Sequence, residues 1–290
     1  MLETWKRNLM LLIRICKASR LVIKKLLKIS LIIITAYFLL AFIFSGEGSY
    51  SFTFERASLK KEVEKVLQNT GGRYGIFIKN LSTDETFLQN EEFEFQPASL
   101  YKLWVMESVF EKIKGGSIQE DDLLVADVAA LNKKFDLDKD EAEFQDGEIN
   151  FSVKSAIEQM ITISHNYAAL ALLDRLGSSE NIPAKTTAKN TADFFERLYL
   201  GEIIDKEYSR KMMDILLRQT INDRIPKYLS AGTKIAHKTG DIGFFENDGG
   251  IVFSPKGDFI IVVLSETEDP AKAGETIAKI SKAAFEYFNP

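Results

Sequence analysis

The chain has 290 residues, of which 46% are hydrophobic and 11% aromatic, enough for a sizeable core in one large domain or two small ones. Residues 1–28 carry eight Lys or Arg and one Glu, a net charge of +7, so the overall −5 leaves −12 for residues 29–290. This acidic remainder excludes a basic face for nucleic acid on the folded part. Two His and a single cysteine, Cys16, exclude an internal disulfide in the main domain and leave few ligands for zinc, so we expect no metal and no cofactor.

Residues 29–46 contain no charged side chain and are mostly Ile, Leu and Phe. Eighteen such residues reach the lower limit for a membrane-spanning helix. The alternatives are a buried core helix, which eight preceding cations disfavour, and a cleaved signal peptide, for which no clear cleavage site follows. We therefore predict a basic cytoplasmic segment at 1–28, a retained transmembrane anchor at 29–46 and a linker at 47–54, with the remaining domain outside the cell.

The domain at 55–290 starts and ends with strand-like patterns and is helical between them. Hydrophobic periodicity predicts a first helix and a last helix, five strands, and helices throughout the middle. The predicted ranges are helix 55–68, strands 74–80 and 85–89, helices from 99 to about 220, strands 234–238, 250–253 and 259–264, and helix 271–288. This order predicts an α+β fold, with one antiparallel sheet built from both chain ends, a helical lobe, and a cleft between them for the site.

An acidic run at 136–147 invites a calcium interpretation. It fails the EF-hand register, because Glu141 stands at the required glycine position and Gly147 at the twelfth position. We interpret the run as a solvated loop.

The pair Ser99 and Lys102 is the first candidate for chemistry. A helix predicted to begin near Ser99 puts both on one face, where the amine could take the proton of the hydroxyl if burial or another cation keeps it neutral. The spacing alone is weak evidence, because Ser58 and Lys61 share it within what reads as a solvated helix face.

Two further groups follow along the chain. Ser164, His165 and Asn166 interrupt two apolar helical stretches, either as a helix cap or as a buried polar site. The second group, residues 238–240 (Lys-Thr-Gly), follows a strand and could simply run into a turn at Gly240.

Together, Ser99-x-x-Lys102, Ser164-x-Asn166 and Lys238-Thr-Gly240 resemble the three motifs of the penicillin-recognising serine enzymes, and are most similar to the class A β-lactamases. The resemblance covers about residues 55–290. It implies that Ser99 is acylated, that Lys102 accepts its proton and that Ser164 passes a proton to the leaving nitrogen.

The same resemblance implies the residues that bind substrate. Asn166 would hold the amide side chain, and Lys238 and Thr239 the carboxylate. Gly240 would leave room against the strand, and the backbone N–H groups of Ser99 and Asp241 would form the oxyanion hole. The substrate would be a β-lactam or a peptidoglycan-type peptide, and we expect a monomer.

The sequence differs from the family pattern at two places, one of which bears on deacylation. His165 replaces the usual Asp, and only about twenty residues separate Asn166 from Lys185-Thr-Thr, too few for the long omega loop with its glutamate. Glu180 is the available substitute. Three functions follow: a membrane-anchored serine hydrolase of the β-lactamase family, a D,D-peptidase or slow penicillin-binding protein, or a sensor that binds without turnover.

Overall fold

The structure is a computed structural model that describes residues 59–68, 70–140, 142–177 and 181–290. The predicted basic segment, the anchor at 29–46 and the linker at 47–54 lie outside the described residues. Within the described residues, no helix is long and apolar enough to cross a membrane.

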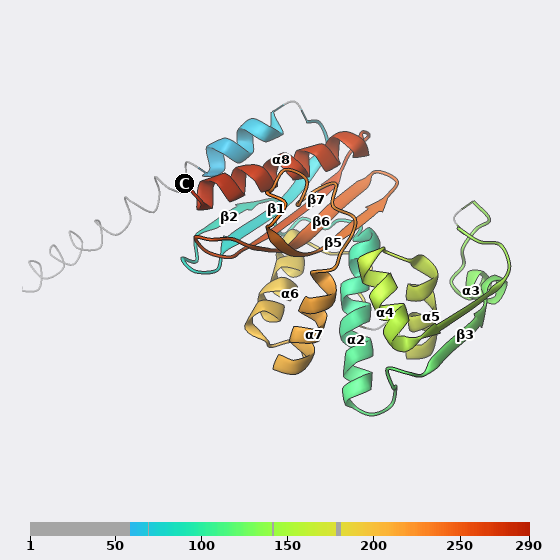
Figure 1. Ribbon diagram of the computed structural model, residues 1–290. Coiled ribbons are helices and arrows are strands. Elements are labelled where there is room, and N and C mark those ends of the chain that lie inside the picture. The colour runs from blue at the N-terminus through green and yellow to red at the C-terminus, as the bar shows by residue number, and fades with distance from the viewer. Residues whose placement is uncertain (1–58, 69, 141, 178–180) are drawn as a thin grey trace, which may run out of the picture. The chain divides into compact units, whose positions relative to one another are not determined.

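The centre of the domain is a five-stranded antiparallel sheet in the order β2-β1-β7-β6-β5 (Figure 1). The strands are β1 (Arg73–Asn80), β2 (Thr86–Gln89), β5 (Lys234–Ile242), β6 (Phe245–Phe253) and β7 (Phe259–Glu266). Strand β7 lies in the middle and is buried along almost its whole length, which explains its nearly continuous apolar sequence. Its pairing with β1 joins the two ends of the domain and confirms the predicted sheet.

Helices cover both faces of this sheet (Figure 1). On one face, helical residues 59–67 and α8 (Pro270–Phe288) bury Leu59, Val63 and Ile277 against apolar strand residues. The other face packs on the helical lobe and forms the larger core. Successive residues of β1 and β7 point alternately into the two cores, as expected for a sheet that is covered on both faces.

The helical lobe is built from residues 98–216. Its helices are a 3₁₀ turn, η1 (Ala98–Tyr101), followed by α2 (Lys102–Lys114), α3 (Val128–Lys134), α4 (Val153–Thr162), α5 (Asn166–Leu176), α6 (Ala188–Leu200) and α7 (Lys206–Leu216). The prediction of helices throughout this region was wrong at two places, because β3 (Leu123–Asp127) pairs with β4 (Glu148–Ser152) in a separate sheet. A five-residue strand that exposes Leu123 and Val125 has too few residues for its period to be distinguished from that of a helix.

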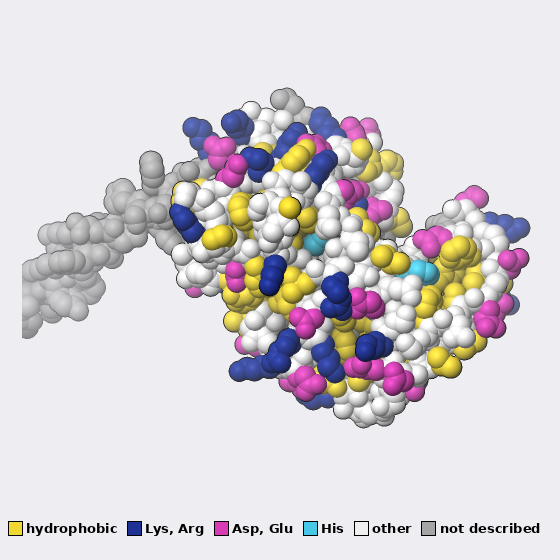
Figure 2. Space-filling model, in the orientation of Figure 1, with side chains coloured by type: hydrophobic (Ala, Val, Ile, Leu, Met, Phe, Trp, Pro, Cys, Tyr) yellow, Lys and Arg dark blue, Asp and Glu magenta, His cyan; other side chains and the backbone are white. Residues whose placement is uncertain are grey.

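Acidic and basic side chains are intermixed on the face displayed in Figure 2. In the described part of the chain, ion pairs join different elements, such as Lys79 with Glu196 at 2.6 Å and Arg218 with Glu158 at 2.6 Å. Neither acidic nor basic side chains predominate on the face displayed in Figure 2, so this face has no strong electrostatic potential of one sign.

Candidate active site

Ser99 lies in the 3₁₀ turn η1, and α2 begins only at Lys102. The helix therefore starts near Ser99 as predicted, but its first turn is tighter than an α-helix. The preceding residue, Ala98, has a positive φ of 47°, a conformation that is uncommon for a residue with a Cβ. Such strained backbone is found often at functional sites and here sets the direction in which Ser99 enters the turn.

Lys102 is fully buried and contacts the second motif. Its Nζ donates to the carbonyl oxygen of Ser164 at 2.6 Å, to Ser164 Oγ at 3.2 Å and to Asn166 Oδ1 at 2.7 Å. The amine is thus bonded to Ser164 and Asn166, not to Ser99 as the shared helix face suggested. Burial lowers the pKa of Lys102 to about 8, although the charges of Glu143 and Asp241 act in the opposite direction.

The second motif forms the junction between α4 and α5. Ser164 has a positive φ of 58°, and His165 is the N-cap of α5, with its Nδ1 accepting from the Ala168 N–H at 3.2 Å. Burial lowers the pKa of His165. The capping interpretation therefore holds for His165, while Ser164 and Asn166 use their side chains toward Lys102.

The third motif lies within β5, which runs on through Gly240 to Ile242, so the alternative interpretation of a turn at Gly240 does not hold. Lys238 is fully buried, and its Nζ donates to Ser164 Oγ at 3.0 Å and to the Thr239 carbonyl at 2.7 Å. Burial, followed by the charge of Lys102, lowers the pKa of Lys238 well below its usual value. Two amines that approach one hydroxyl disfavour each other's protonation.

A cleft of about 700 Å³ opens where these motifs meet. Ser99, Asn166 and Asp241 line it, together with Tyr101 and Glu143. Three stretches that are far apart in the sequence thus meet at one cavity. A serine hydroxyl at a cleft, backed by a buried amine of lowered pKa, is an arrangement suited to nucleophilic attack on a carbonyl.

The model of the β-lactamase enzyme family matches residues 58–185 and 178–288. The chain belongs to this family, and the solved structures that it resembles include class A β-lactamases and PBP-A. None of the curated proteins matches the chain.

Solved structures of the family share the fold. PBP-A is 22% identical with a TM-score of 0.68, covering 80% of this chain and 96% of PBP-A. A β-lactamase from Sphaerobacter thermophilus is 23% identical with a TM-score of 0.68, covering 80% of this chain and 97% of that one. The extended-spectrum β-lactamase TLA-3 is 21% identical with a TM-score of 0.69, covering 80% of this chain and 98% of that one.

A buried arginine that the sequence did not single out, Arg224, lies in the loop before β5. Its Nη2 contacts Asp241 Oδ1 at 3.1 Å, its Nε contacts Glu246 Oε1 at 2.5 Å, and its Nη1 donates to the Asn247 carbonyl at 3.0 Å. The guanidinium is therefore shared between Asp241, which lines the cleft, and Glu246. No local signal distinguishes Arg224 from a surface arginine, because its acidic partners on β5 and β6 come from farther along the chain.

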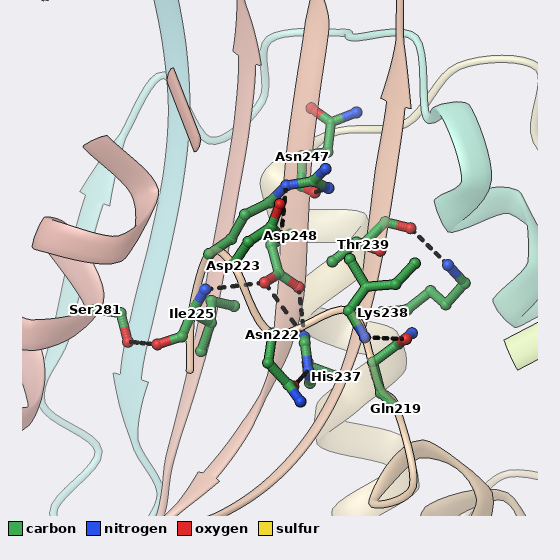
Figure 3. A network of polar contacts seen from close by, with 12 residues as sticks. Gln219, Asn222, Asp223, Ile225, His237, Lys238, Thr239, Asn247, Asp248 and Ser281 are labelled. Atoms are coloured by element: carbon green, nitrogen blue, oxygen red, sulfur yellow. Dashed lines mark hydrogen bonds and ion pairs between the residues drawn. The ribbon is translucent and has the colours of Figure 1, made fainter. Parts of the chain in front are cut away.

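A network of buried polar residues connects β5, β6 and the loop before β5 (Figure 3). Asp248 accepts the Ile225 N–H at 3.0 Å and contacts His237 Nδ1 at 3.0 Å, while His237 Nε2 lies 3.2 Å from Asn222 Oδ1. Ser281 of α8 donates to the Ile225 carbonyl at 2.8 Å. The network therefore connects β5, which carries Lys238, to α8 through the loop before β5.

The acidic run is exposed over residues 143–146, as a solvated loop should be, but one of its members has a place in the site. Glu143 lines the cleft and accepts from Asn166 Nδ2 at 2.6 Å. The sequence prediction missed this contact. Glu180, the proposed deacylating residue, lies outside the described residues.

Gly240 lies where β5 approaches η1, and a Cβ there would come within 2.7 Å of the Pro97 carbonyl, 2.9 Å of the Leu100 nitrogen and 3.0 Å of the Ser99 nitrogen. We expect Gly240→Ala to lower the free energy of unfolding by about 1–3 kcal/mol, because these contacts are to backbone. Denaturant unfolding would measure this effect.

Gly232→Ala is the matched control, because a Cβ at Gly232 meets nothing within 4 Å. We expect its free energy of unfolding to stay within about 0.5 kcal/mol of wild type. Equal effects of the two substitutions would contradict the close approach of β5 to η1.

Proposed function

We propose that this protein is a serine hydrolase that forms an acyl-enzyme with β-lactams through Ser99. In this reaction Ser99 Oγ attacks the lactam carbonyl carbon, its proton passes to neutral Lys102, and the carbon–nitrogen bond breaks. Ser164 delivers a proton to the leaving nitrogen and takes the proton held by Lys102, whose Nζ lies 3.2 Å from Ser164 Oγ. The backbone N–H groups of Ser99 and Asp241 stabilise the oxyanion. The observation that carries the proposal is that Ser99 and Asn166 line one cleft while the buried Lys102 hydrogen-bonds to Asn166 and to Ser164.

Substrate binding is assigned to the remaining motif residues. Asn166 binds the amide of the acyl side chain, Lys238 and Thr239 bind the carboxylate, and Gly240 leaves room for the substrate beside β5. The hydroxyl of Thr239 supports this role, because it is buried without a hydrogen-bond partner among the described residues. A buried hydroxyl ordinarily has a partner, and a substrate carboxylate would supply one. A mutant of PBP-A has been solved as an acyl-enzyme complex with penicillin G.

We also propose how the chain is placed relative to the cell membrane. Residues 29–46 anchor the protein as a single transmembrane helix, residues 1–28 stay in the cytoplasm and the catalytic domain lies outside the cell. The uncharged stretch behind eight cations supports this arrangement.

A second function, that of a D,D-peptidase or slow penicillin-binding protein, is favoured by the short connection between α5 and α6. Leu176 ends α5 and Ala188 begins α6, which leaves little chain for an omega loop. Among the described residues, the carboxylates that line the cleft are Glu143 and Asp241, and Asp241 is paired with Arg224. Acylation without rapid deacylation is the expected behaviour of such a site.

The experiment is to incubate the full chain in detergent with penicillin G and follow its intact mass over time. The proposed function predicts an adduct of one penicillin. An adduct that vanishes within minutes identifies a β-lactamase, whereas one that lasts for hours identifies the peptidase-like function. No adduct from a folded protein would overturn both and leave a binding module without turnover.

A further inference from the structure

The side chain of Asn166 is held at both ends. Its Oδ1 accepts from Lys102 at 2.7 Å, and its Nδ2 donates to Glu143 Oε1 at 2.6 Å. An amide nitrogen carries two hydrogens, so one N–H remains for a ligand in the cleft. Glu143 thus fixes the orientation of the group that is proposed to bind the acyl side chain.

Glu143 is itself held by its neighbour Phe144. The Phe144 carbonyl accepts from Asn132 Nδ2 at 2.8 Å and from the Tyr167 hydroxyl at 2.8 Å. The Phe144 ring also packs on the Tyr167 ring with centroids 5.2 Å apart. Although its side chain is exposed, Glu143 stands on a backbone tied to both α3 and α5.

The charge of Glu143 is not neutralised by a cation within ion-pair distance in the described part of the chain. Its hydrogen-bond partner is a neutral amide, whereas the other cleft carboxylate, Asp241, is paired with Arg224 at 3.1 Å. The end of the cleft beside Asn166 therefore carries a negative charge without a direct ion pair, and the buried Lys102 lies on the other side of the Asn166 amide. In a partly enclosed cleft such a charge is screened less than on an open surface.

We propose that Glu143 and Asn166 form the subsite for the acyl side chain, and that Glu143 selects acyl donors that carry an ammonium group next to their amide. This inference rests on the proposed function. The amide carbonyl of the donor accepts the free N–H of Asn166, which places the adjoining carbon beside Glu143. An ammonium on that carbon is attracted to the carboxylate, and a carboxylate there is repelled.

Three penicillins test the inference, because ampicillin, penicillin G and carbenicillin differ at this carbon by an ammonium, a hydrogen and a carboxylate. We expect the second-order rate constant for acylation of the full chain to fall in that order, with ampicillin about tenfold faster than carbenicillin. In Glu143→Gln the ratio should fall to about one, since glutamine still accepts from Asn166 but has no charge. Glu143→Lys should reverse the order.

Asp146→Asn is the matched control, since Asp146 belongs to the same exposed run but does not line the cleft. It should keep the wild-type ratio. Unchanged ratios in both Glu143 variants would overturn the subsite while leaving acylation intact. Failure of all three penicillins to acylate the wild-type chain would instead overturn the proposed function.

A second readout separates the charge of Glu143 from a purely structural role. Glu143 raises the pKa of Lys102, so its neutralisation should lower that pKa further. The rise of penicillin G acylation with pH is expected to move to lower pH in Glu143→Gln and to stay in place in Asp146→Asn. A shift of the same size in both variants would contradict the inference.

Discussion

Replacing Ser99 with alanine is expected to abolish covalent labelling of the full chain by a fluorescent penicillin. The substitution removes the only atom proposed to bond to the lactam carbonyl. Because Ser99 is partly exposed at the cleft and alanine favours helix, the fold should be retained. Labelling would be measured by in-gel fluorescence after a fixed incubation.

Ser58→Ala is the control for this experiment. Ser58 has the same spacing to a lysine, Lys61, but belongs to a stretch with the charge pattern of a solvated helix face. We expect full labelling of this variant. Labelling that persists in Ser99→Ala, with circular dichroism unchanged, would show that another residue is acylated and that the three motifs do not form the reactive centre.

The sheet and its outer helices could be predicted from the sequence because their patterns are long. Strand β7 and helix α8 have enough residues for their periods to be recognised, and both were placed correctly to within a few residues. The short β3 and β4 were missed because each is half exposed and only a few residues long. Their pairing depends on the tertiary fold and cannot be predicted from either segment alone.

The motif residues of the site were found from their order along the chain, whereas their partners were not. Glu143 reaches Asn166 from 23 residues away, and nothing in the acidic run marks it out from its neighbours. Arg224 is comparable, since its contact with Asp241 depends on how the segment before β5 is folded back. A polar side chain that completes a site across a loop gives no local signal, because its role is set by the backbone path.

The acylation rate is expected to rise with pH up to about 8, where Lys102 loses its proton. Lys102 must be neutral to accept the proton of Ser99, so lowering the pH from 8 to 6 should slow acylation by penicillin G about fiftyfold. A lysine with an ordinary pKa would keep the enzyme nearly inactive throughout this range. The charged groups that act on the amine are Glu143 and Asp241, and the amine in turn acts on Lys238.

Lys102→Met tests the same base by removing it. Methionine fills a similar volume in this fully buried position but cannot take a proton, so acylation should fall by about 10²–10⁴-fold and lose its rise with pH. Circular dichroism at each pH would separate lost chemistry from lost fold. If instead the wild-type rate does not change between pH 6 and 8, or if Lys102→Met acylates normally, the proton of Ser99 goes elsewhere. Lys238, the other buried amine that contacts Ser164 Oγ, would then be the base to test.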